Sequence, residues 1–407
     1  MSDNHLTFTG FLGKRIHIGI CGSVAACAVP SLLRRLLETE AGVGATLTAS
    51  GERFLPALTL RALGADPVYT TLFDHEDAVF GHLAPGESAD CLLIAPATAN
   101  ILAKMAHGLA DDMLSTQALS FNRSIVVAPA MNPRMWDAPA TQANWQTLRD
   151  RGVIGVDPEV GRVACGDTGQ GRLADSRRIL MAVLRAMAPK YLEGKKIFLT
   201  LGPTREYFDP VRFWSNPSSG TMGGALAVAA WMLGAHVTVA SGPVDMWLPD
   251  GITVHKTPTA QAMYEAAMDT WPAMDMACLC AAVADFSPVA HGASKFKKES
   301  ASADNGLTVH FNRTKDILQS LGDSKKTHQK LIGFCAETDD LEKQAEGKLR
   351  RKHCDLIVGN DITRPDAGFG VATNRVFVLD AKGRAETWPT LAKTEVAWRI
   401  WEWIAHL

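Results

Sequence analysis

The sequence predicts two α/β domains, each built on a mostly parallel β-sheet with helices on both faces. Short apolar runs alternate with helix-like stretches, which is typical of strand, helix, strand units. The alternation restarts after a polar turn near residue 190, and 407 residues are too many for one ordinary core. We therefore expect one domain over residues 1–190 and a second over residues 191–407.

The first half begins with a strand, a turn and a helix. Apolar residues recur at every second position in Arg15–Cys21, which predicts the strand. A turn at Gly22-Ser23 follows, and Val24–Leu37 is expected to be helical, with Pro30 marking a kink or a fresh first turn. Another helix is expected over Ser176–Met187. Apolar runs bounded by Gly, Pro or Asn predict further strands at Gly44–Ser50, Cys91–Pro96 and Ile125–Pro129.

The second half repeats the pattern. Ile197–Leu201 and His236–Ala240 are expected to be strands, joined through a helix over Met222–Leu233 in a right-handed crossover. Buried strands are expected at Ala277–Ala284 and Asp355–Val358, and an edge strand at Val376–Leu379.

Composition excludes several partners and locations. The formal net charge of -2 gives no overall field for nucleic acid or an anionic membrane, so we expect neither partner. No apolar run approaches the ~20 residues that span a bilayer, and the polar start of the chain lacks the features of a signal peptide. Eight scattered cysteines do not form the dense pattern of a secreted disulfide scaffold, which favours the cytoplasm.

Polar residues follow two predicted strands of the first half, where open α/β sheets bind ligands. Gly22-Ser23 leads into a helix whose free N–H groups favour a phosphate, although such a turn also simply starts helices. Pro96–Asn100 offers a hydroxyl at Thr98 and an amide at Asn100, or only a helix cap.

Two later motifs carry chemistry of another kind. An exposed amide, Asn132, follows a predicted strand in the run 129–136. Cys165 lies between glycine-flanked turns in the run 164–172, so its thiol is expected to be accessible. His82, after Gly81, has a neutral-range pKa suited to proton transfer, or is a surface histidine after a turn.

These motifs occur together in an order and spacing that resembles the flavin-dependent cysteine decarboxylase family over residues 13–187, and the run around Cys165 resembles the flap of phosphopantothenoylcysteine decarboxylases. The resemblance implies a flavodoxin-like fold that binds FMN. It also implies that His82 is the active-site histidine, that Asn132 binds the substrate carboxylate and that Cys165 donates a proton. The FMN-binding residues implied are Gly22, Ser23, Ser50, Pro96, Thr98 and Asn100.

These roles meet a chemical need. A carboxylate leaves as carbon dioxide only if the charge left on the neighbouring carbon is delocalised, and a thiol alone delocalises it poorly. Oxidation of the thiol to a thioaldehyde by FMN removes this obstacle, and an acid such as Cys165 on a closing flap completes the return reduction.

A loop rich in Arg, Ser and Gly follows the first strand of the second half. It runs from Gly202 to Gly224 and contains Asn216, with a glycine-rich helix start suited to phosphate recognition. A Walker-type lysine is absent, which excludes a P-loop, while a generic dinucleotide-binding fold stays open.

With later motifs, this loop resembles CTP-dependent bacterial phosphopantothenate–cysteine ligases over residues 191–380. The resemblance implies a Rossmann-like α/β domain in which Asn216 holds the carboxylate of 4'-phosphopantothenate and Lys295 neutralises charge on the transferred phosphate. Mg2+ would bridge the triphosphate, with protein ligands unknown. The implied CTP-binding residues are Asp285, Lys295, Thr314, Lys315, Asp316, Ile317, Phe334, Lys348 and Lys352.

The chain departs from both families at named positions. Cys27 and Ala28 replace an aromatic residue and a lysine, which changes packing near the flavin or a subunit contact. Thr221 replaces a lysine in the glycine-rich run. If that lysine contacts phosphate, we expect either a lower affinity here or a contact supplied by Arg205 or Arg212.

The leading hypothesis is an enzyme that joins 4'-phosphopantothenate to cysteine and then decarboxylates phosphopantothenoylcysteine to 4'-phosphopantetheine. The resemblance also implies a homo-oligomer, with trimeric flavin domains and dimeric ligase domains in a dodecamer. One alternative is a non-catalytic FMN-binding regulatory or scaffold protein. Another is a flavin domain that acts on the C-terminal cysteine of a peptide, which the run around Cys165 disfavours.

Overall fold

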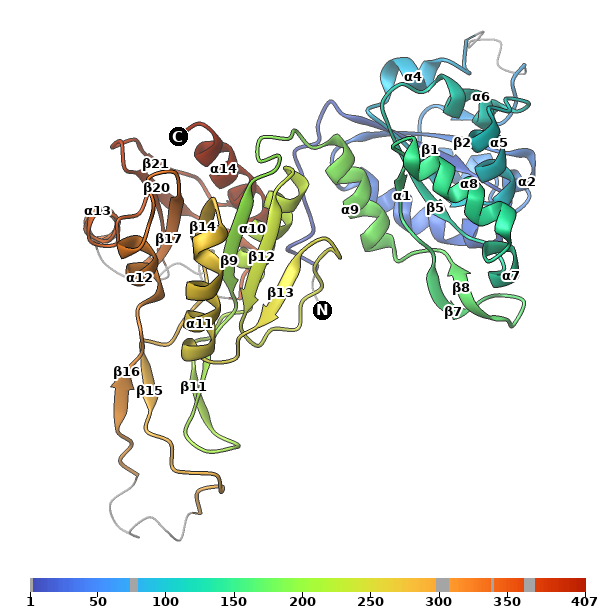
Figure 1. Ribbon diagram of the computed structural model, residues 1–407. Helices are drawn as coiled ribbons and strands as arrows, with labels where there is room; N and C mark the ends of the chain where they lie inside the picture. The colour runs from blue at the N-terminus through green and yellow to red at the C-terminus, as the bar shows by residue number, and fades with distance from the viewer. Residues whose placement is uncertain (1–2, 74–79, 298–306, 338–339, 362–369) are drawn as a thin grey trace. The chain divides into compact units, whose positions relative to one another are not determined.

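The computed structural model describes residues 3–73, 80–297, 307–337, 340–361 and 370–407 (Figure 1). The chain divides into two compact units. The first unit comprises Thr7–Ala188, and the second comprises Pro189–Leu407 together with Met1–Leu6.

An open, entirely parallel sheet forms the centre of the first unit. Its order is β3-β2-β1-β4-β5-β6, so the winding reverses between β1 and β4. Without the two-residue strand β3, the remaining five have the order of a flavodoxin-like sheet. The strands are β1 (Arg15–Ile20), β2 (Gly42–Leu47), β3 (Val68–Tyr69), β4 (Cys91–Ala97), β5 (Ser124–Pro129) and β6 (Ile154–Gly155).

Helices cover this sheet, and a hairpin extends from it. The hairpin is formed by β7 (Glu159–Arg162) and β8 (Thr168–Arg172), which pair antiparallel. The helices are η1 (Val24–Ala28), α1 (Val29–Leu37), α2 (Ala49–Glu52), α3 (Ala57–Ala62), α4 (Ala84–Ser88), α5 (Ala99–His107), α6 (Met113–Ser120), α7 (Pro133–Trp136), α8 (Pro139–Asp150) and α9 (Ser176–Met187).

Two predicted elements of the first unit differ in detail. The helix expected over 24–37 is divided, because Pro30 lies in the first turn of α1 and a 3-10 helix precedes it. The strand expected over 44–50 ends at Leu47. The Thr48 side chain accepts a hydrogen bond from the Gly51 backbone and caps α2, so Ser50 is helical.

An eight-stranded sheet forms the centre of the second unit, in the order β13-β12-β9-β14-β17-β18-β20-β21. The first six strands are parallel, and β20 and β21 join antiparallel. The strands are β9 (Lys196–Leu201), β12 (His236–Ser241), β13 (Thr253–Lys256), β14 (Met276–Leu279), β17 (Lys330–Glu337), β18 (Leu356–Asp361), β20 (Val376–Asp380) and β21 (Ala385–Thr387).

Two strand predictions are corrected here. The strand expected over 277–284 ends at Leu279, and the residues that follow leave the sheet. The strand expected at the edge, 376–379, is β20, which lies between β18 and β21. The sequence before β21 contains a glycine turn at Gly383 that returns the chain for one more short strand.

Helices and small hairpins complete the second unit. The helices are α10 (Thr221–Met232), α11 (Ala260–Thr270), η2 (Trp271–Ala273), α12 (Ile317–Asp323), α13 (Leu341–Arg351) and α14 (Lys393–Ala405). The hairpins pair β10 (Arg205–Tyr207) with β11 (Phe213–Ser215), β15 (Phe286–Pro288) with β16 (Phe311–Arg313), and β19 (Thr373–Asn374) with β22 (Leu391–Ala392). Figure 1 shows β11, β15 and β16 extending away from the large sheet.

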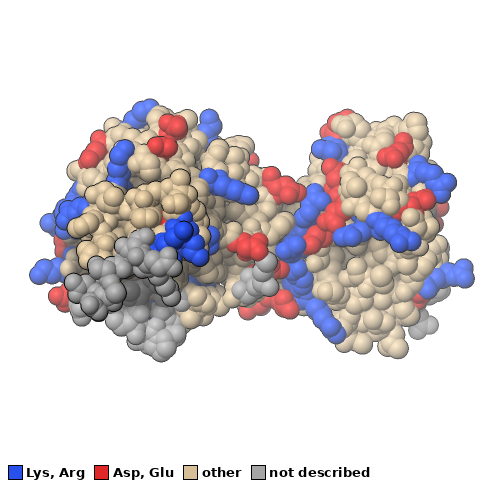
Figure 2. All heavy atoms as spheres, turned by 90° about the horizontal axis from the view of Figure 1, so that it is seen from below, with Lys and Arg blue, Asp and Glu red and all other residues tan. Residues whose placement is uncertain are grey.

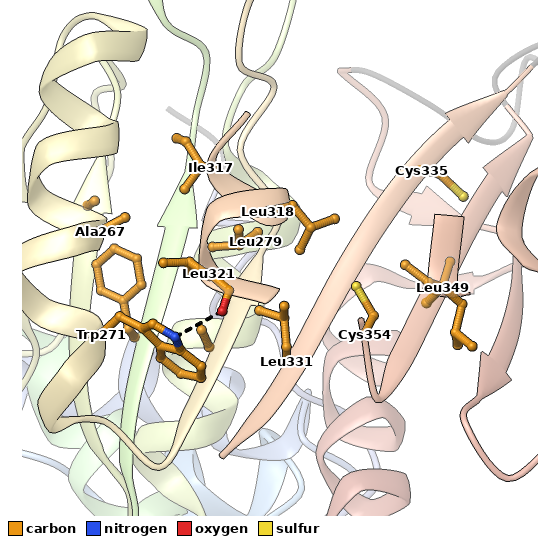
Figure 3. Packing of buried hydrophobic residues seen from close by; sticks show 14 of the residues in the cluster. Ala267, Trp271, Leu279, Ile317, Leu318, Leu321, Leu331, Cys335, Leu349 and Cys354 are labelled. Atoms are coloured by element: carbon orange, nitrogen blue, oxygen red, sulfur yellow. Dashed lines mark hydrogen bonds between the residues drawn. The ribbon is translucent and has the colours of Figure 1, made fainter. Parts of the chain in front are cut away.

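Part of the second core lies between α11, α12 and the sheet (Figure 3). Trp271 is almost completely buried there, and its indole Nε1 donates to the Leu321 carbonyl at 3.2 Å. Because a buried indole N–H is costly without an acceptor, this bond fixes the end of α11 against α12.

Acidic and basic side chains are interspersed on the face drawn in Figure 2. Among the described residues, no helix is both long enough and apolar enough to cross a membrane.

Candidate functional site

The carboxyl ends of β1, β2 and β4 bring together most of the predicted FMN-binding residues. A Cβ on Gly22 would overlap the Ser50 side chain, so the loops after β1 and β2 touch at this glycine. Ser23 caps η1 by accepting from the Ala25 N–H at 3.3 Å. The neighbouring strand β4 contributes the Pro96 carbonyl, which accepts from the Cys21 N–H at 3.2 Å.

Thr98 and Asn100 follow β4 at the same edge, Thr98 half-buried and Asn100 exposed. Thr98 hydrogen-bonds to the Cys21 thiol, but burial dominates and raises the pKa of Cys21 to about 12. Cys21 is therefore a neutral thiol rather than a nucleophile. The edge offers hydroxyls, an amide and backbone N–H groups, a donor set that fits a phosphate and the polar rim of a flavin.

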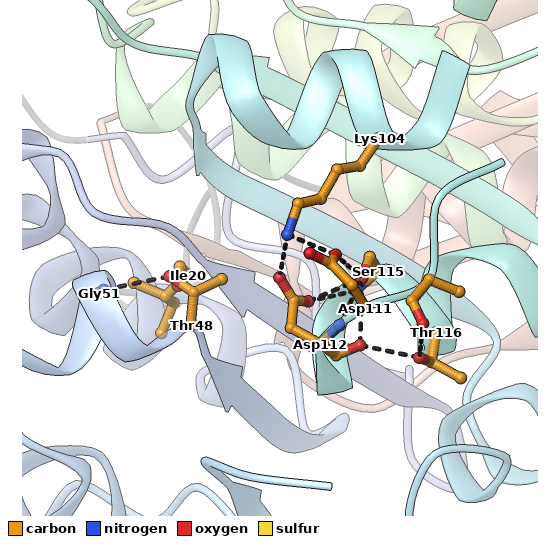
Figure 4. Close-up of polar contacts among 9 residues, drawn as sticks. Ile20, Thr48, Gly51, Lys104, Asp111, Asp112, Ser115 and Thr116 are labelled. Atoms are coloured by element: carbon orange, nitrogen blue, oxygen red, sulfur yellow. Dashed lines mark hydrogen bonds and ion pairs between the residues drawn. The ribbon is translucent and has the colours of Figure 1, made fainter. Parts of the chain in front are cut away.

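Two polar clusters hold these loops in place (Figure 4). Thr48 Oγ1 donates to the Ile20 carbonyl at 3.4 Å and accepts from Gly51, which ties the loop after β2 to the end of β1. On α5, Lys104 Nζ lies 2.6 Å from Asp111 and 2.7 Å from Asp112. Burial alone would lower the pKa of Lys104, but these hydrogen bonds outweigh burial and raise it.

Asn132 and Cys165 lie in direct contact. Asn132 Nδ2 lies 3.1 Å from Cys165 Sγ and 2.7 Å from Asp167 Oδ2. Arg134 Nη2 donates to the same Asp167 oxygen at 2.9 Å. The hydrogen bond from Asn132, followed by those from Arg134, lowers the pKa of Asp167. The loop after β5 and the β7–β8 hairpin thus form one polar cluster with an exposed thiol.

Glycines allow the hairpin to approach the loop after β5. The Met131 N–H donates to the Gly171 carbonyl at 2.9 Å, and a Cβ on Gly171 would overlap the Met131 carbonyl oxygen. A Cβ on Gly169 would lie 2.8 Å from a Pro133 side-chain carbon. Close packing therefore requires glycine at positions 169 and 171, which the sequence pattern alone did not reveal.

His82 is not in contact with Asn132 or Cys165 within one chain. It precedes α4, which lies at the opposite end of the first unit from the β7–β8 hairpin in Figure 1. Its backbone carbonyl accepts from Ser120 Oγ at 3.2 Å, and its ring lies 6.3 Å from that of Phe80, centroid to centroid.

A buried chain of hydrogen bonds positions the residue before His82. His17 Nε2 contacts Thr46 Oγ1 at 2.7 Å, Thr46 donates to Gln117 Oε1 at 2.6 Å, and Gln117 Nε2 donates to the Gly81 carbonyl at 3.1 Å. Burial, followed by Arg15, lowers the pKa of His17 to about 3. A neutral His17 that donates from Nε2 satisfies every step of the chain.

A cleft of about 930 Å³ lies at the carboxyl edge of the second sheet. It brings together residues predicted to bind CTP from separate parts of the chain, namely Asp285, Thr314, Lys315, Asp316, Ile317, Phe334 and Lys348, and also Asn216. Lys348 Nζ donates to the Phe334 carbonyl at 2.7 Å, and Lys315 Nζ lies 4.6 Å from the centroid of the Tyr264 ring.

Lys352 contacts this group through Asp316. Its Nζ pairs with Asp316 Oδ2, while Asp316 Oδ1 accepts from the Gln319 N–H and caps α12. Burial tends to raise the pKa of Asp316, but the bond from Lys352 and the cap outweigh burial and lower it. Lys348 lies in α13 and Lys352 is the residue that ends it. Both lysines of the predicted pair therefore contact residues of the cleft, Lys348 through the Phe334 carbonyl and Lys352 through Asp316.

Asn216 and Thr221 lie on the glycine-rich side of the cleft. Asn216 Nδ2 donates to the carbonyls of Ala282 and Val283 at 3.3 and 3.2 Å. Thr221 begins α10, and its hydroxyl lies 2.8 Å from that of Ser219. The residue before it, Gly220, has φ of 76°, which glycine adopts without strain.

Lys295 and the two arginines do not line the cleft. Lys295 is exposed, next to Phe296, whose N–H donates to Asp209 at 3.1 Å. Arg212 pairs with the same Asp209 carboxylate at 2.9 Å, and the guanidinium of Arg205 lies 4.8 Å from the ring centroid of Phe213. Within one chain the structure therefore does not bring Arg205 or Arg212 to Thr221, because both side chains make contacts in the β10–β11 region.

Sequence reasoning missed two cationic residues of the cleft, Arg313 and Lys393. Lys393, the first residue of α14, lines it although the side chain is only 4% exposed. Burial lowers the pKa of Lys393, and the nearby Cys280 thiol partly offsets this effect. No motif marked this residue, because it lies far along the chain from the glycine-rich loop.

Across the described ranges, no group of three or more His, Cys, Asp or Glu side chains is arranged to hold a metal ion.

Comparison with known proteins follows the two units. Residues 11–188 match the family model described as Flavoprotein, and residues 192–407 match the one described as DNA/pantothenate metabolism flavoprotein C-terminal domain. The chain is 40% identical to the Coenzyme A biosynthesis bifunctional protein CoaBC of Bacillus subtilis (strain 168) over 97% of both chains.

Two further likenesses cover less of this chain. A Cysteine/Cysteine sulfinic acid decarboxylase from an unknown prokaryotic organism is 41% identical over 84% of this chain and 96% of its own. The crystal structure of a CoaBC C-terminal domain has 38% identity and a TM-score of 0.45, covering 53% of this chain and 97% of the other. The full-length match shows that the chain belongs to the family of bifunctional coenzyme A biosynthesis enzymes, which combine a decarboxylase and a ligase in one polypeptide.

Proposed function

We propose that the second unit joins 4'-phosphopantothenate to cysteine through an acyl-cytidylate made from CTP, and that the first unit decarboxylates the product to 4'-phosphopantetheine. The observation that carries this proposal is the presence of two separate sites at sheet edges of one chain: a thiol-bearing cluster in the first unit and a cationic cleft in the second. We assign the two activities to residues 1–190 and 191–407, apart from the N-terminal segment that packs on the second unit.

In the decarboxylase, FMN would be held by Gly22, Ser23, Ser50, Thr98 and Asn100 around the Pro96 loop, and would supply oxidation of the substrate thiol and return of the hydride. The close approach at Gly22 and the hydroxyls at this edge support that assignment. Asn132 would bind the substrate carboxylate through Nδ2. Cys165 would then deliver the final proton, and its contact with Asn132 supports a location beside the reacting carbons.

His82 would accept the proton of the substrate thiol. His82 precedes α4 and Cys165 lies on the β7–β8 hairpin, and Figure 1 shows these elements at opposite ends of the first unit. We therefore propose that one site combines His82 of one subunit with Asn132 and Cys165 of another. This arrangement agrees with FMN sites at the contacts of a flavin-domain trimer.

In the ligase, the carboxylate of 4'-phosphopantothenate would attack the α-phosphate of CTP and release pyrophosphate. The cysteine amine would then attack the acyl carbon and release CMP. The cleft supports this sequence, because Lys315 and Lys348 offset the nucleotide charge and Mg2+ would bridge the triphosphate.

Two assigned residues require movement. Asn216 would exchange a carbonyl partner for the substrate carboxylate. Lys295 would enter the cleft from its own loop or from that of a second subunit.

A dimeric ligase is supported by apolar side chains left exposed on the two extended hairpins. They are Tyr207, Phe213, Trp214, Phe286 and Phe311, each between 39% and 57% exposed. With flavin trimers, dimeric contacts would build a dodecamer. Mass measured by light scattering tests this, and a monomer at micromolar concentration would overturn it.

All eight cysteines are free thiols, which supports a reducing cytoplasm as the location.

The decisive experiment incubates the purified protein with 4'-phosphopantothenate, cysteine, CTP and Mg2+ and follows products by mass spectrometry. We expect CMP, pyrophosphate and 4'-phosphopantetheine, and a yellow protein with noncovalent FMN. If phosphopantothenoylcysteine accumulates without further conversion, or if the protein cannot take up FMN, the proposed decarboxylase activity of the first unit is excluded. A scaffold protein would form no product, and conversion of free cysteine or a peptide instead would assign another substrate.

Two variants separate the activities. Cys165→Ser should release carbon dioxide but fail to complete the reduction, and an unchanged yield of 4'-phosphopantetheine would remove Cys165 from the mechanism. Lys295→Gln should stop ligation and leave decarboxylation of supplied phosphopantothenoylcysteine intact.

A further inference from the structure

The turn that carries His82 is held by two side chains of α6 that lie three residues apart. Gln117 Nε2 donates to the Gly81 carbonyl at 3.1 Å, and Ser120 Oγ donates to the His82 carbonyl at 3.2 Å. The Phe80 carbonyl accepts from the N–H three residues further on, at 2.8 Å. Three consecutive carbonyls of this turn therefore have defined partners, two of them on α6.

The side chains behind Gln117 allow it only one orientation. A carbonyl oxygen only accepts hydrogen bonds, so the amide nitrogen of Gln117 must face Gly81, and its amide oxygen must face Thr46. The Thr46 hydroxyl then donates to Gln117 and accepts from Nε2 of His17. Each bond fixes the next, from β1 through β2 and α6 to the turn before α4.

These three side chains lie in the interior of the first unit. His17 is 3% exposed, and Thr46 and Gln117 are fully buried. Gly44, the partner of His17 in the β1–β2 ladder, leaves room for the ring, because a Cβ there would lie 2.8 Å from Nδ1. Apolar side chains would fill this interior at less cost, so what the polar chain adds is a fixed position for the turn.

The imidazole of His82 depends on this backbone for its position. Within the part of the chain that the structure describes, no residue hydrogen-bonds to the ring, which is half-buried and lies near the Phe80 ring of the same turn. A general base must come within hydrogen-bond distance of the proton that it accepts. The position of the turn therefore determines whether His82 reaches the substrate thiol.

We propose that Gln117 is a positioning residue, which holds His82 where it accepts the proton of the substrate thiol. Thr46 and His17 orient Gln117, and Ser120 fixes the next carbonyl of the turn. All of them act through the backbone rather than on the substrate itself. The inference rests on the decarboxylase function proposed above and assigns a role to residues that no sequence motif marked.

Gln117→Met tests this role, because methionine has a similar length but cannot replace the hydrogen bonds of the amide. We expect kcat of decarboxylation to fall about 10- to 100-fold, because a displacement of about 1 Å at a reacting group can cost that much. The KM for phosphopantothenoylcysteine should stay unchanged, since Asn132 would still bind the carboxylate. Normal uptake of FMN shows that the first unit of the variant is folded.

Two hydroxyls of α6 provide a matched comparison. Ser120→Ala should lower kcat less than Gln117→Met, because the Ser120 proton is shared with the Gln117 carbonyl at 3.1 Å. Thr116→Ala removes a hydroxyl that donates to the Asp112 carbonyl at 2.8 Å, and it should behave as the unmodified protein. If Gln117→Met does not fold, equal kcat values for Ser120→Ala and Thr116→Ala would overturn the proposal.

A double-mutant cycle separates positioning from a general effect on the fold. His82→Gln removes the base, so adding Gln117→Met should lower kcat no further if Gln117 acts through His82. A second loss by the same factor would show an independent structural effect and overturn the proposal. If His82→Gln alone decarboxylates as the unmodified protein does, the proposed role of His82 itself fails. That result is distinct, because Gln117 then has no base to position.

Hydrogen exchange reports on the turn without the reaction. In protein freed of FMN, the peptide that spans residues 80–84 should exchange its amide hydrogens faster in Gln117→Met than in the unmodified protein, because the turn opens more often. Mass spectrometry measures this, and Thr116→Ala should leave the exchange unchanged. Equal exchange in Gln117→Met and the unmodified protein would show that the buried chain does not hold the turn.

Discussion

Asn132 uses one amide nitrogen for two partners on the β7–β8 hairpin, the Cys165 thiol and the Asp167 carboxylate. Asp167 thereby occupies the position that a substrate carboxylate would take. Its lowered pKa keeps it charged throughout the neutral pH range, so the competition should persist there and weaken only as the pH falls through the lowered value.

Asp167→Asn should therefore lower the KM for phosphopantothenoylcysteine several-fold, since a competing charge is removed from Asn132. Steady-state decarboxylation kinetics measure this, with Asp137→Asn, an exposed carboxylate at the end of α7, as the control. A raised KM would mean that Asp167 helps to bind substrate rather than to exclude it.

The resemblance gave Asn132 and Cys165 roles in one reaction, but the sequence did not predict that the two side chains touch, and it did not assign roles to Asp167 or Lys393. Residue types and glycine spacing identify an accessible thiol, because those features are local in the chain. They do not reveal which distant polar group shares a hydrogen bond or lines a cleft. Lys393 is an example, because a lysine at a helix start is usually exposed, whereas Lys393 is buried although it begins α14.

At the scale of elements, α6 is fixed by a capping box that also reaches α5. Asp112 accepts from the Ser115 N–H at 2.8 Å and pairs with Lys104. Burial tends to raise the pKa of Asp112, but the bonds from Lys104 and Ser115 outweigh burial and lower it. Asp112 therefore stabilises the fold above its unfolded pKa, and this contribution is lost as the pH falls through the lower folded value.

Asp112→Ala should destabilise the first unit by about 1 kcal/mol through loss of the cap. Asp112→Asn keeps a capping oxygen but removes the charge, so it should destabilise the unit less than Asp112→Ala. The stability difference between Asp112→Asn and the unmodified protein then measures the contribution of the charge. Thermal denaturation followed by flavin release measures both, and the difference between Asn and Asp should vanish at low pH. An equal effect of Asp111→Asn, which is exposed and does not cap, would assign the stabilisation to Lys104 rather than to the cap.

The β7–β8 hairpin offers a matched pair of glycines. Gly171→Ala would drive a Cβ into the Met131 carbonyl, so β8 must shift away from the loop that carries Asn132. We expect decarboxylation to fall at least ten-fold while ligation is unchanged. Gly161→Ala on β7 meets only the flexible Arg172 side chain at 3.6 Å and should be nearly silent. Equal loss in both variants would indicate that the hairpin tolerates no β-carbon at all.

The sequence predicted long, strongly periodic elements well, as α9 over 176–187 illustrates. It did not predict the short elements. The hairpins β10–β11 and β15–β16 have three residues per strand, too few for a period to emerge. The strand ending at Leu279 was extended too far, because the apolar residues after it line a cleft instead of continuing the sheet.

For the whole molecule, the division into two α/β units followed from the restart of the pattern near residue 190, but the position of the N-terminal segment did not. Met1–Leu6 belongs with the second unit, although the chain then continues into the first. Six residues carry too little pattern to show which core they join. Leu6 is 1% exposed, and His5 Nε2 contacts the Trp247 carbonyl at 2.7 Å.

This segment makes the stability of the ligase unit depend on residues that precede the decarboxylase unit. Leu6→Ala removes a buried side chain and should cost about 2–3 kcal/mol, at the low end for buried leucines because a terminal segment can readjust. After graded heating of the full-length protein, residual ligation should be lost at a lower temperature than in the unmodified protein, with residual decarboxylation unaffected. Asn4→Ala, an exposed neighbour, should change neither. Loss of decarboxylation first would mean that Leu6 stabilises the flavin unit, contrary to its packing.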